Sequence, residues 1–179
     1  MIYADHNATS PLRPEARQAM LDVWGMGATN PSSVHTAGRA ARGVLERARL
    51  AIGGAIGSRA EDVILTGGGT EADNLAIHGV AVALDGHCTF LVSAIEHEAV
   101  TKAAAHSGVQ VRTAYVRPDG TLDLNQLQDQ LSDWDHAKLG TPVLCLMLAN
   151  NETGVIQPVG EAARIVREAG GLTICDAVQ

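Results

Sequence analysis

Aromatic residues are scarce in this chain of 179 residues, because Phe, Tyr and Trp together make up only 3% of it. A planar ligand would find few aromatic faces to stack on, so another flat side chain would have to take that role. Excess positive charge is also absent: 13 basic residues face 20 acidic ones, and the formal net charge is −7. This balance argues against nucleic acid or an anionic membrane as a partner. It still allows a local phosphate site, since backbone amides bind phosphate without basic side chains.

Cysteines are few as well. The chain has three, an odd number, and no C-x-x-C spacing, which excludes a disulfide framework and a zinc site. Cys145 and Cys175 lie in the apolar runs "VLCLML" and "LTIC", so we expect reduced, buried strand thiols in a cytoplasmic protein without a metal site. The start "MIYADHN" does not resemble a signal peptide. The longest apolar run, residues 143–149, is far shorter than the roughly 20 residues of a membrane span.

From residue 59 onward, short apolar runs alternate with helical patterns. We predict strands at 62–66, 88–93, 109–115, 142–148 and 172–175, with helices at 70–84, 97–106, 124–134 and 159–169 between them. This alternation is typical of an α/β fold with a mostly parallel sheet. A helix at 36–56 precedes it. Residues 1–35 are rich in turn residues and are interpreted as an arm that packs elsewhere, or as a simple irregular terminus.

The segment "ILTGGGTEADNLAIHG" follows a predicted strand and opens a helix. Glycines allow close approach of backbone amides to an anion, and the helix amino terminus and the Thr70 hydroxyl add to the attraction. A plain glycine turn capped by Thr70 is the simpler alternative. A sharper rival is the dinucleotide pattern G-x-G-x-x-A formed by Gly67, Gly69 and Ala72. That pattern also requires an acidic residue closing the second strand, and here Glu96 comes late and is followed at once by a histidine.

Polar residues follow three further predicted strands. His97 comes after strand 88–93 and offers a flat ring that is also an acid–base group, although a lone histidine is more often a capping or surface residue. Asn150 and Asn151 follow strand 142–148, where they either form a turn or direct one amide at a ligand. Asp176 and Gln179 follow the last strand, and a carboxylate fixed there calls for a cationic partner.

Because the carboxyl ends of parallel strands share one edge of a sheet, these groups are expected to meet. A phosphate cradle, a flat acid–base ring, amides and a carboxylate together describe a site for a phosphorylated heteroaromatic ring with a basic nitrogen. Pyridoxal phosphate fits that description. NAD fits it less well, because nothing in nicotinamide requires an anion.

Six stretches extend this reading: "YADHNATSPLRPEA", "NPSSVHTAGRAAR", "GGGTEADNLAIHG", "SAIEHEAV", "ANNETGVIQPV" and "CDAVQ". In this order they resemble the amino-terminal half of cysteine desulfurases, which are pyridoxal-phosphate enzymes related to class V aminotransferases. The resemblance implies the large domain of PLP fold type I for residues 36–179, incomplete at its carboxyl end. It also implies that residues 1–35 form an arm contributing to the small domain and the edge of the active site.

The resemblance also implies roles for single residues. Gly69 and Thr70 match contacts to the cofactor phosphate, and His97 matches the histidine that stacks on the ring and moves protons. Asn151 and Gln179 match amides near the ring oxygen. Asp176 matches the carboxylate that keeps the ring nitrogen protonated.

What the resemblance implies for the whole protein reaches beyond this chain. L-cysteine would be converted to alanine, with the sulfur passing as a persulfide to a sulfur-acceptor protein for iron–sulfur cluster assembly or another sulfur transfer. The Schiff-base lysine, the nucleophilic cysteine and the substrate-binding arginine match nothing here. We therefore expect this chain alone to be inactive, to need its complementary half and to work as a homodimer. Alternatives are a selenocysteine lyase, a class V aminotransferase relative, or a non-catalytic dinucleotide-binding or degenerate module.

Overall fold

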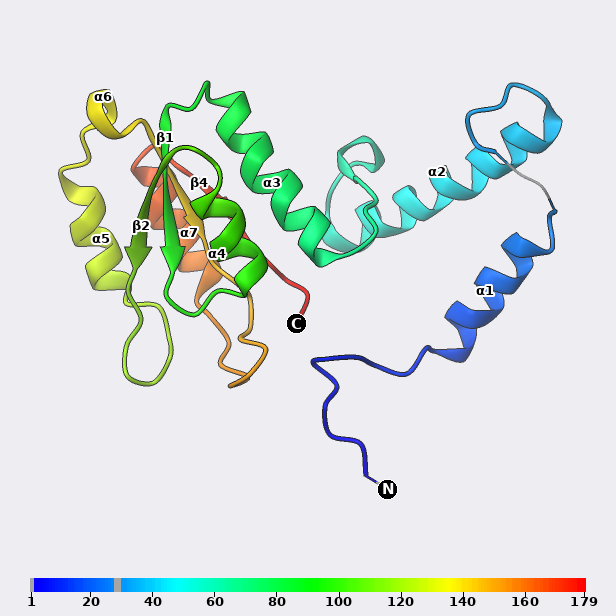
Figure 1. Cartoon of the computed structure of the whole chain (residues 1–179), viewed down its shortest axis with the longest axis horizontal. Coiled ribbons are helices and arrows are strands. Elements are labelled where there is room, and N and C mark those ends of the chain that lie inside the picture. Colours follow the sequence, from blue (N-terminus) through cyan, green and yellow to red (C-terminus); the bar gives the residue numbers. More distant parts are fainter. Residues whose placement is uncertain (1, 28–29) are drawn as a thin grey trace. The chain divides into compact units, whose positions relative to one another are not determined.

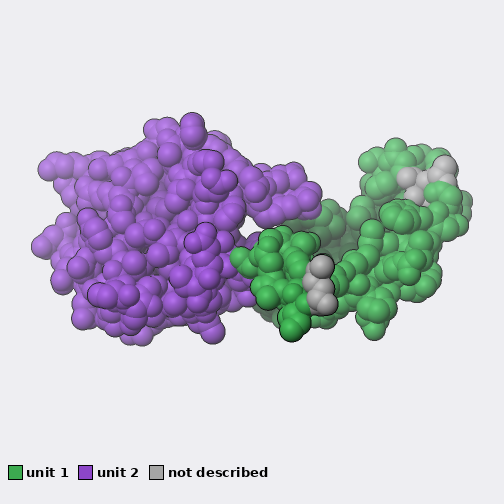
Figure 2. Space-filling view, turned by 60° about the horizontal axis from the view of Figure 1, so that its bottom comes forward, with its two compact units in different colours: residues 1–65 green, residues 66–179 purple. Residues whose placement is uncertain are grey.

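The computed structural model describes residues 2–27 and 30–179, which divide into two compact units, Met1–Leu65 and Thr66–Gln179. The two units are coloured separately in Figure 2. The first unit contains α1 (Pro14–Trp24), α2 (Thr36–Ile56) and the short 3₁₀ helix η1 (Ala60–Asp62). The predicted helix at 36–56 is confirmed. Helix α1 was not expected within the turn-rich segment, although Pro14 at its first position is a favourable helix start.

The second unit holds the sheet and five helices, α3 to α7; most of its elements are labelled in Figure 1. In chain order they are α3 (Gly69–Ala83), β1 (Cys88–Ser93), α4 (Glu98–Ala105), β2 (Gln110–Ala114), α5 (Leu124–Ser132), α6 (His136–Leu139), β3 (Thr141–Cys145), α7 (Val159–Glu168) and β4 (Leu172–Ile174). The strands form one sheet in the order β2-β1-β3-β4, and every pairing is parallel. The predicted α/β class is therefore confirmed.

Alternation along the strands builds a core on each face of this sheet. Phe90 and Val92 of β1 pack with α3 and α4, whereas Leu91 between them packs with α5 and α7. Residues at successive strand positions point to opposite faces, so a continuous apolar run is what a sheet covered on both sides requires. Phe90, Leu91, Val143 and Leu144 are all fully enclosed.

The strand order creates a switch point between β1 and β3. From β1 the chain runs through α4 to β2 on one side; it then crosses back through α5 and α6 to β3 on the other side. Crossovers in opposite directions place their helices on opposite faces, and a crevice opens at the carboxyl ends of the two central strands. Residues 94–97 and 146–151 follow those strand ends.

Two predictions from the sequence are wrong. No strand forms at 62–66: residues 60–62 are η1 and the rest is irregular, with Ile64 68% exposed. A strand exists only through pairing, and no segment among the described residues pairs with this one. Cys175 is exposed and lies just after β4, whereas Cys88 and Cys145 are buried.

No helix in the described part of the chain is long and apolar enough to cross a membrane.

Candidate active site at the strand ends

Helix α3 begins with amides that no side chain caps. Its N-cap is Gly68, and the first backbone bond into the helix runs from the Ala72 amide to the Gly68 carbonyl. The amides of Gly69 and Thr70 therefore precede the hydrogen-bonded part of the helix and are available to an anion. The Gly67 amide is not, because it donates to the Glu71 carboxylate at 2.7 Å.

The dinucleotide alternative is not favoured by this geometry. That motif follows a strand and needs its last small residue for close helix–strand packing. Here no strand precedes the glycines within the described residues 30–66, and Ala72 is exposed.

His97 is the N-cap of α4. Its Nδ1 accepts a hydrogen bond from the Ala99 amide at 3.2 Å, which requires that nitrogen to be unprotonated. A neutral ring therefore carries its proton on Nε2, while the ring itself is exposed. The capping role, which was the simpler alternative from the sequence, is present, and Nε2 forms no hydrogen bond among the described residues.

The two asparagines after β3 divide the roles that the sequence left open. The Asn150 Oδ1 accepts hydrogen bonds from the amides of Glu152 and Thr153 at 3.0 and 2.9 Å, so Asn150 builds the turn. Both asparagines line a cavity of about 680 Å³ together with Glu96 and His97. The Asn150 amide is used at both ends, by the turn and by the Ile95 carbonyl, whereas the half-buried Asn151 amide forms no hydrogen bond among the described residues.

Asp176 lies two positions beyond the last β3–β4 pair, and its carbonyl accepts a hydrogen bond from the Leu148 amide at 2.8 Å. Its carboxylate is half-buried and accepts from the Val178 amide at 3.0 Å. Among the described residues no Lys or Arg forms an ion pair with it. The ordinary cationic partner is therefore missing, as it would be if a ligand supplied the positive charge.

Of the remaining predicted residues, Thr70 and Gly69 lie close to this edge of the sheet, whereas Gln179 is not tied to it. A cavity of about 310 Å³ is lined by both Thr70 and His97, which brings the start of α3 next to the histidine. A Cβ at Gly69 would lie 3.3 Å from the Val178 side chain, so the segment after Asp176 passes close to the same helix end. Gln179 is exposed, and among the described residues its side chain forms no hydrogen bond with the other groups.

Two further carboxyl groups, which sequence reasoning missed, stand beside Asp176. Burial raises the pKa of Asp73 on α3; the Asp176 carboxylate raises it further and His97 opposes the rise. Burial is also the main reason that the pKa of Glu96 rises to about 7, with smaller contributions from Asp176 and Asp73. The only sequence signal for Glu96 was its place directly before His97.

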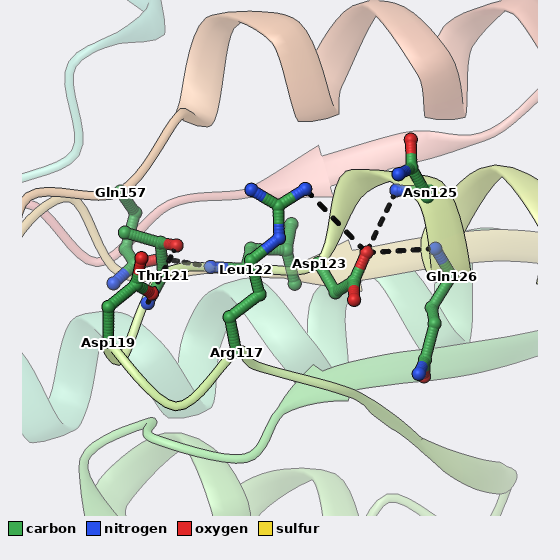
Figure 3. Close-up of polar contacts among 8 residues, drawn as sticks. All are labelled: Arg117, Asp119, Thr121, Leu122, Asp123, Asn125, Gln126 and Gln157. Carbon is green, nitrogen blue, oxygen red and sulfur yellow. Dashed lines mark hydrogen bonds and ion pairs between the residues drawn. The ribbon is translucent and has the colours of Figure 1, made fainter.

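The wall of the larger cavity is held by a buried amide, also missed from the sequence. Gln157 is 4% exposed; its Oε1 accepts from the Leu122 amide at 2.8 Å and its Nε2 donates to the Gly120 carbonyl at 2.9 Å. These bonds tie the turn at 117–121 to the loop that follows Asn151. Figure 3 shows this turn with Asp123, which caps α5 through the amides of Asn125 and Gln126.

Comparison with known proteins matches this chain to the model of the aminotransferase class-V family over residues 2–179. The chain belongs to the class-V aminotransferase family. Its curated relatives include a cysteine desulfurase from Cereibacter sphaeroides, which is 39% identical over 183 residues. The match covers 99% of this chain and 46% of that relative. The chain thus spans about half the length of the curated relatives it matches, consistent with the resemblance to one half of such an enzyme.

Solved structures of other proteins share the fold. A NifS-like protein from Rickettsia africae superimposes with a TM-score of 0.84 at 28% identity, covering 98% of this chain and 47% of that one. SspA in complex with cysteine gives a TM-score of 0.84 at 25% identity, covering 99% of this chain and 50% of that one.

Proposed function

We propose that this chain supplies the cofactor-binding half of a pyridoxal-phosphate-dependent cysteine desulfurase. The observation that carries the proposal is Asp176: a half-buried carboxylate without a Lys or Arg partner in the described part of the chain, at the edge where the uncapped α3 and His97 also lie. The related proteins of that name support the reaction, and the SspA structure with cysteine supports the substrate.

The residues present fit this cofactor. The free amides of Gly69 and Thr70 and the Thr70 hydroxyl suit a phosphate group, and an anion at a helix amino terminus is favoured by about 0.3–1 kcal/mol or more. Asp176 suits a protonated ring nitrogen. Pyridoxal phosphate, when bound, supplies a pyridinium ring that accepts electrons from the substrate carbon.

The chain's own groups then have distinct tasks. Asp176 would hold the proton on the ring nitrogen, because a neighbouring carboxylate favours the cationic form. His97 would lie against the ring and hold a proton at Nε2, since its Nδ1 is occupied by the Ala99 amide. Asn151 and Gln179 would donate to the ring oxygen.

The complete protein is further proposed to act on L-cysteine, to pass sulfur to an acceptor protein, and to be a cytoplasmic homodimer. This chain alone is proposed to be inactive. Its two lysines, Lys102 and Lys138, both pair with carboxylates of their own helical segments, with Glu98 at 2.7 Å and Asp135 at 3.3 Å. Both lie in segments that match no catalytic motif of the family, so neither is proposed for the Schiff base.

The test is alanine and sulfide formation from L-cysteine by the complete protein, with and without added pyridoxal phosphate. Asp176→Asn should lower kcat by about ten- to a hundredfold, because a hydrogen bond to a charged group is worth about 1.5–3 kcal/mol. Asp129→Asn on the exposed surface of α5 is the matched control and should change nothing. A parent protein that binds the cofactor without releasing alanine, or an Asp176→Asn variant within about twofold of the parent, contradicts the proposal.

A further inference from the structure

Two side chains join the connection after β1 to the connection after β3. The Glu96 Oε1 accepts a hydrogen bond from the Met147 amide at 2.8 Å, across 51 residues of sequence. The Asn150 Nδ2 donates in the opposite direction, to the Ile95 carbonyl at 3.0 Å, across 55 residues. We call Glu96 and Asn150 the strand-end clasp. It bridges the switch point between the two central strands, beyond Val92 and Cys145, the last residues that pair β1 with β3.

Each half of the clasp immediately precedes a residue of the proposed site. His97 follows Glu96, and Asn151 follows Asn150. Consecutive Cα atoms are about 3.8 Å apart, so fixing one residue leaves little freedom for the next. The Ala99 amide, which donates to the His97 Nδ1 at 3.2 Å, then fixes the tilt of the ring. The clasp therefore sets the spacing between the imidazole and the amide.

Glu96 is an unusual choice for this position. Its Oε2 is buried and has no hydrogen-bond partner among the described residues. A carboxylate in that position would bear an enclosed, unpaired charge, whereas a carboxylic acid leaves only one hydroxyl without a partner. Two neighbouring carboxyl groups add to this pressure, Asp73 on α3 and Asp176 after β4, and the nearby Cys145 and Cys175 thiols offer no positive charge.

We propose that Glu96, acting as a neutral hydrogen-bonding side chain, is the positioning residue that holds His97 and Asn151 at their working separation. The expected change in kcat rests on the proposed desulfurase function. The expected change in protection of the Met147 amide does not. Glu96 itself need not touch the substrate or the cofactor. Its effect on the reaction passes through the two residues that follow the clasp.

The experiment compares Glu96→Gln with Glu96→Leu in the complete protein. Glutamine keeps an acceptor for Met147 and resembles the neutral acid, whereas leucine keeps similar bulk and removes the acceptor. The control is Glu168→Gln, which removes a carboxylate from an exposed ion pair with Arg164 on α7. The first readout is hydrogen exchange of the Met147 amide without cofactor or substrate. The second is kcat and KM for L-cysteine.

We expect Glu96→Leu to speed exchange at Met147 at least about tenfold, the order expected for one lost hydrogen bond, and to lower kcat by about tenfold or more with KM little changed. Glu96→Gln should restore both to within about threefold of the parent. Unchanged Met147 exchange in Glu96→Leu, or faster exchange with unchanged kcat, overturns the proposal. A Glu96→Gln variant that is as impaired as Glu96→Leu also overturns the proposal. If Glu96→Leu does not fold, the comparison of Glu96→Gln with the parent tests the proposal by itself. If the parent itself does not turn over cysteine, the proposed function fails while the exchange data still test the clasp.

Discussion

Ionisation of Glu96 is expected to destabilise this fold. Its carboxyl has a pKa of 4.5 in an exposed setting and about 7 in the folded chain, mainly because burial disfavours the charged form. A group that binds its proton more tightly when folded stabilises the fold at low pH and loses that contribution as pH rises through the folded pKa. The free energy of unfolding should therefore fall between about pH 4.5 and pH 7 and level off above it. Since one pKa unit equals about 1.4 kcal/mol, the full loss is about 3 kcal/mol.

The assay is urea unfolding of the parent and of Glu96→Gln between pH 5 and pH 9. Glutamine cannot ionise, so the difference between the two proteins removes the contribution of every other titrating group. We expect the variant to gain about 2–3 kcal/mol over the parent across this range. The reasoning is refuted if the difference in unfolding free energy stays constant within about 0.5 kcal/mol, because Glu96 would then titrate as an exposed carboxyl does.

Three further outcomes are expected. Gly140→Ala should lower the free energy of unfolding by about 3 kcal/mol or more, because φ is +66° and a Cβ would overlap the His87 carbonyl. Its control, Gly79→Ala in open space on α3, should raise that free energy by about 0.5–1 kcal/mol. Equal unfolding free energies of the two variants would contradict this. His97→Asn should retain the α4 cap while His97→Ala loses about 1 kcal/mol of stability, yet both should lose most turnover; an active asparagine variant would show that the ring is not needed. Thr70→Val should weaken pyridoxal phosphate binding by about ten- to a hundredfold in a cofactor titration, because the hydroxyl is lost at constant volume, and unchanged affinity would remove Thr70 from the phosphate site.

Local patterns predicted most elements because their causes are local. The helices at 97–106 and 159–169 have apolar residues at helical spacing, and His97 supplies a cap at the start of the first. Parallel strands buried on both faces appear as unbroken apolar runs, and the runs at 88–93 and 172–175 became β1 and β4. The predicted strand at 62–66 failed for the opposite reason. Its residues have strand propensity, but a strand also needs a neighbour, and propensity contains no information about one.

The sequence by itself determined the α/β class, the order of elements and the row of polar residues that follow the strands. Position after a parallel strand is enough to place a residue at one edge of the sheet, so His97, Asn151 and Asp176 were expected there before any coordinates. The strand order was not determined, and with it the switch point between β1 and β3. Only tertiary structure assigned Asn150 to the turn, and enclosed Gln157 and the Oε2 of Glu96. The enclosure of Gln157 and Glu96 depends on contacts between segments 35 and 51 residues apart, where burial and missing partners decide the charge and role of a side chain.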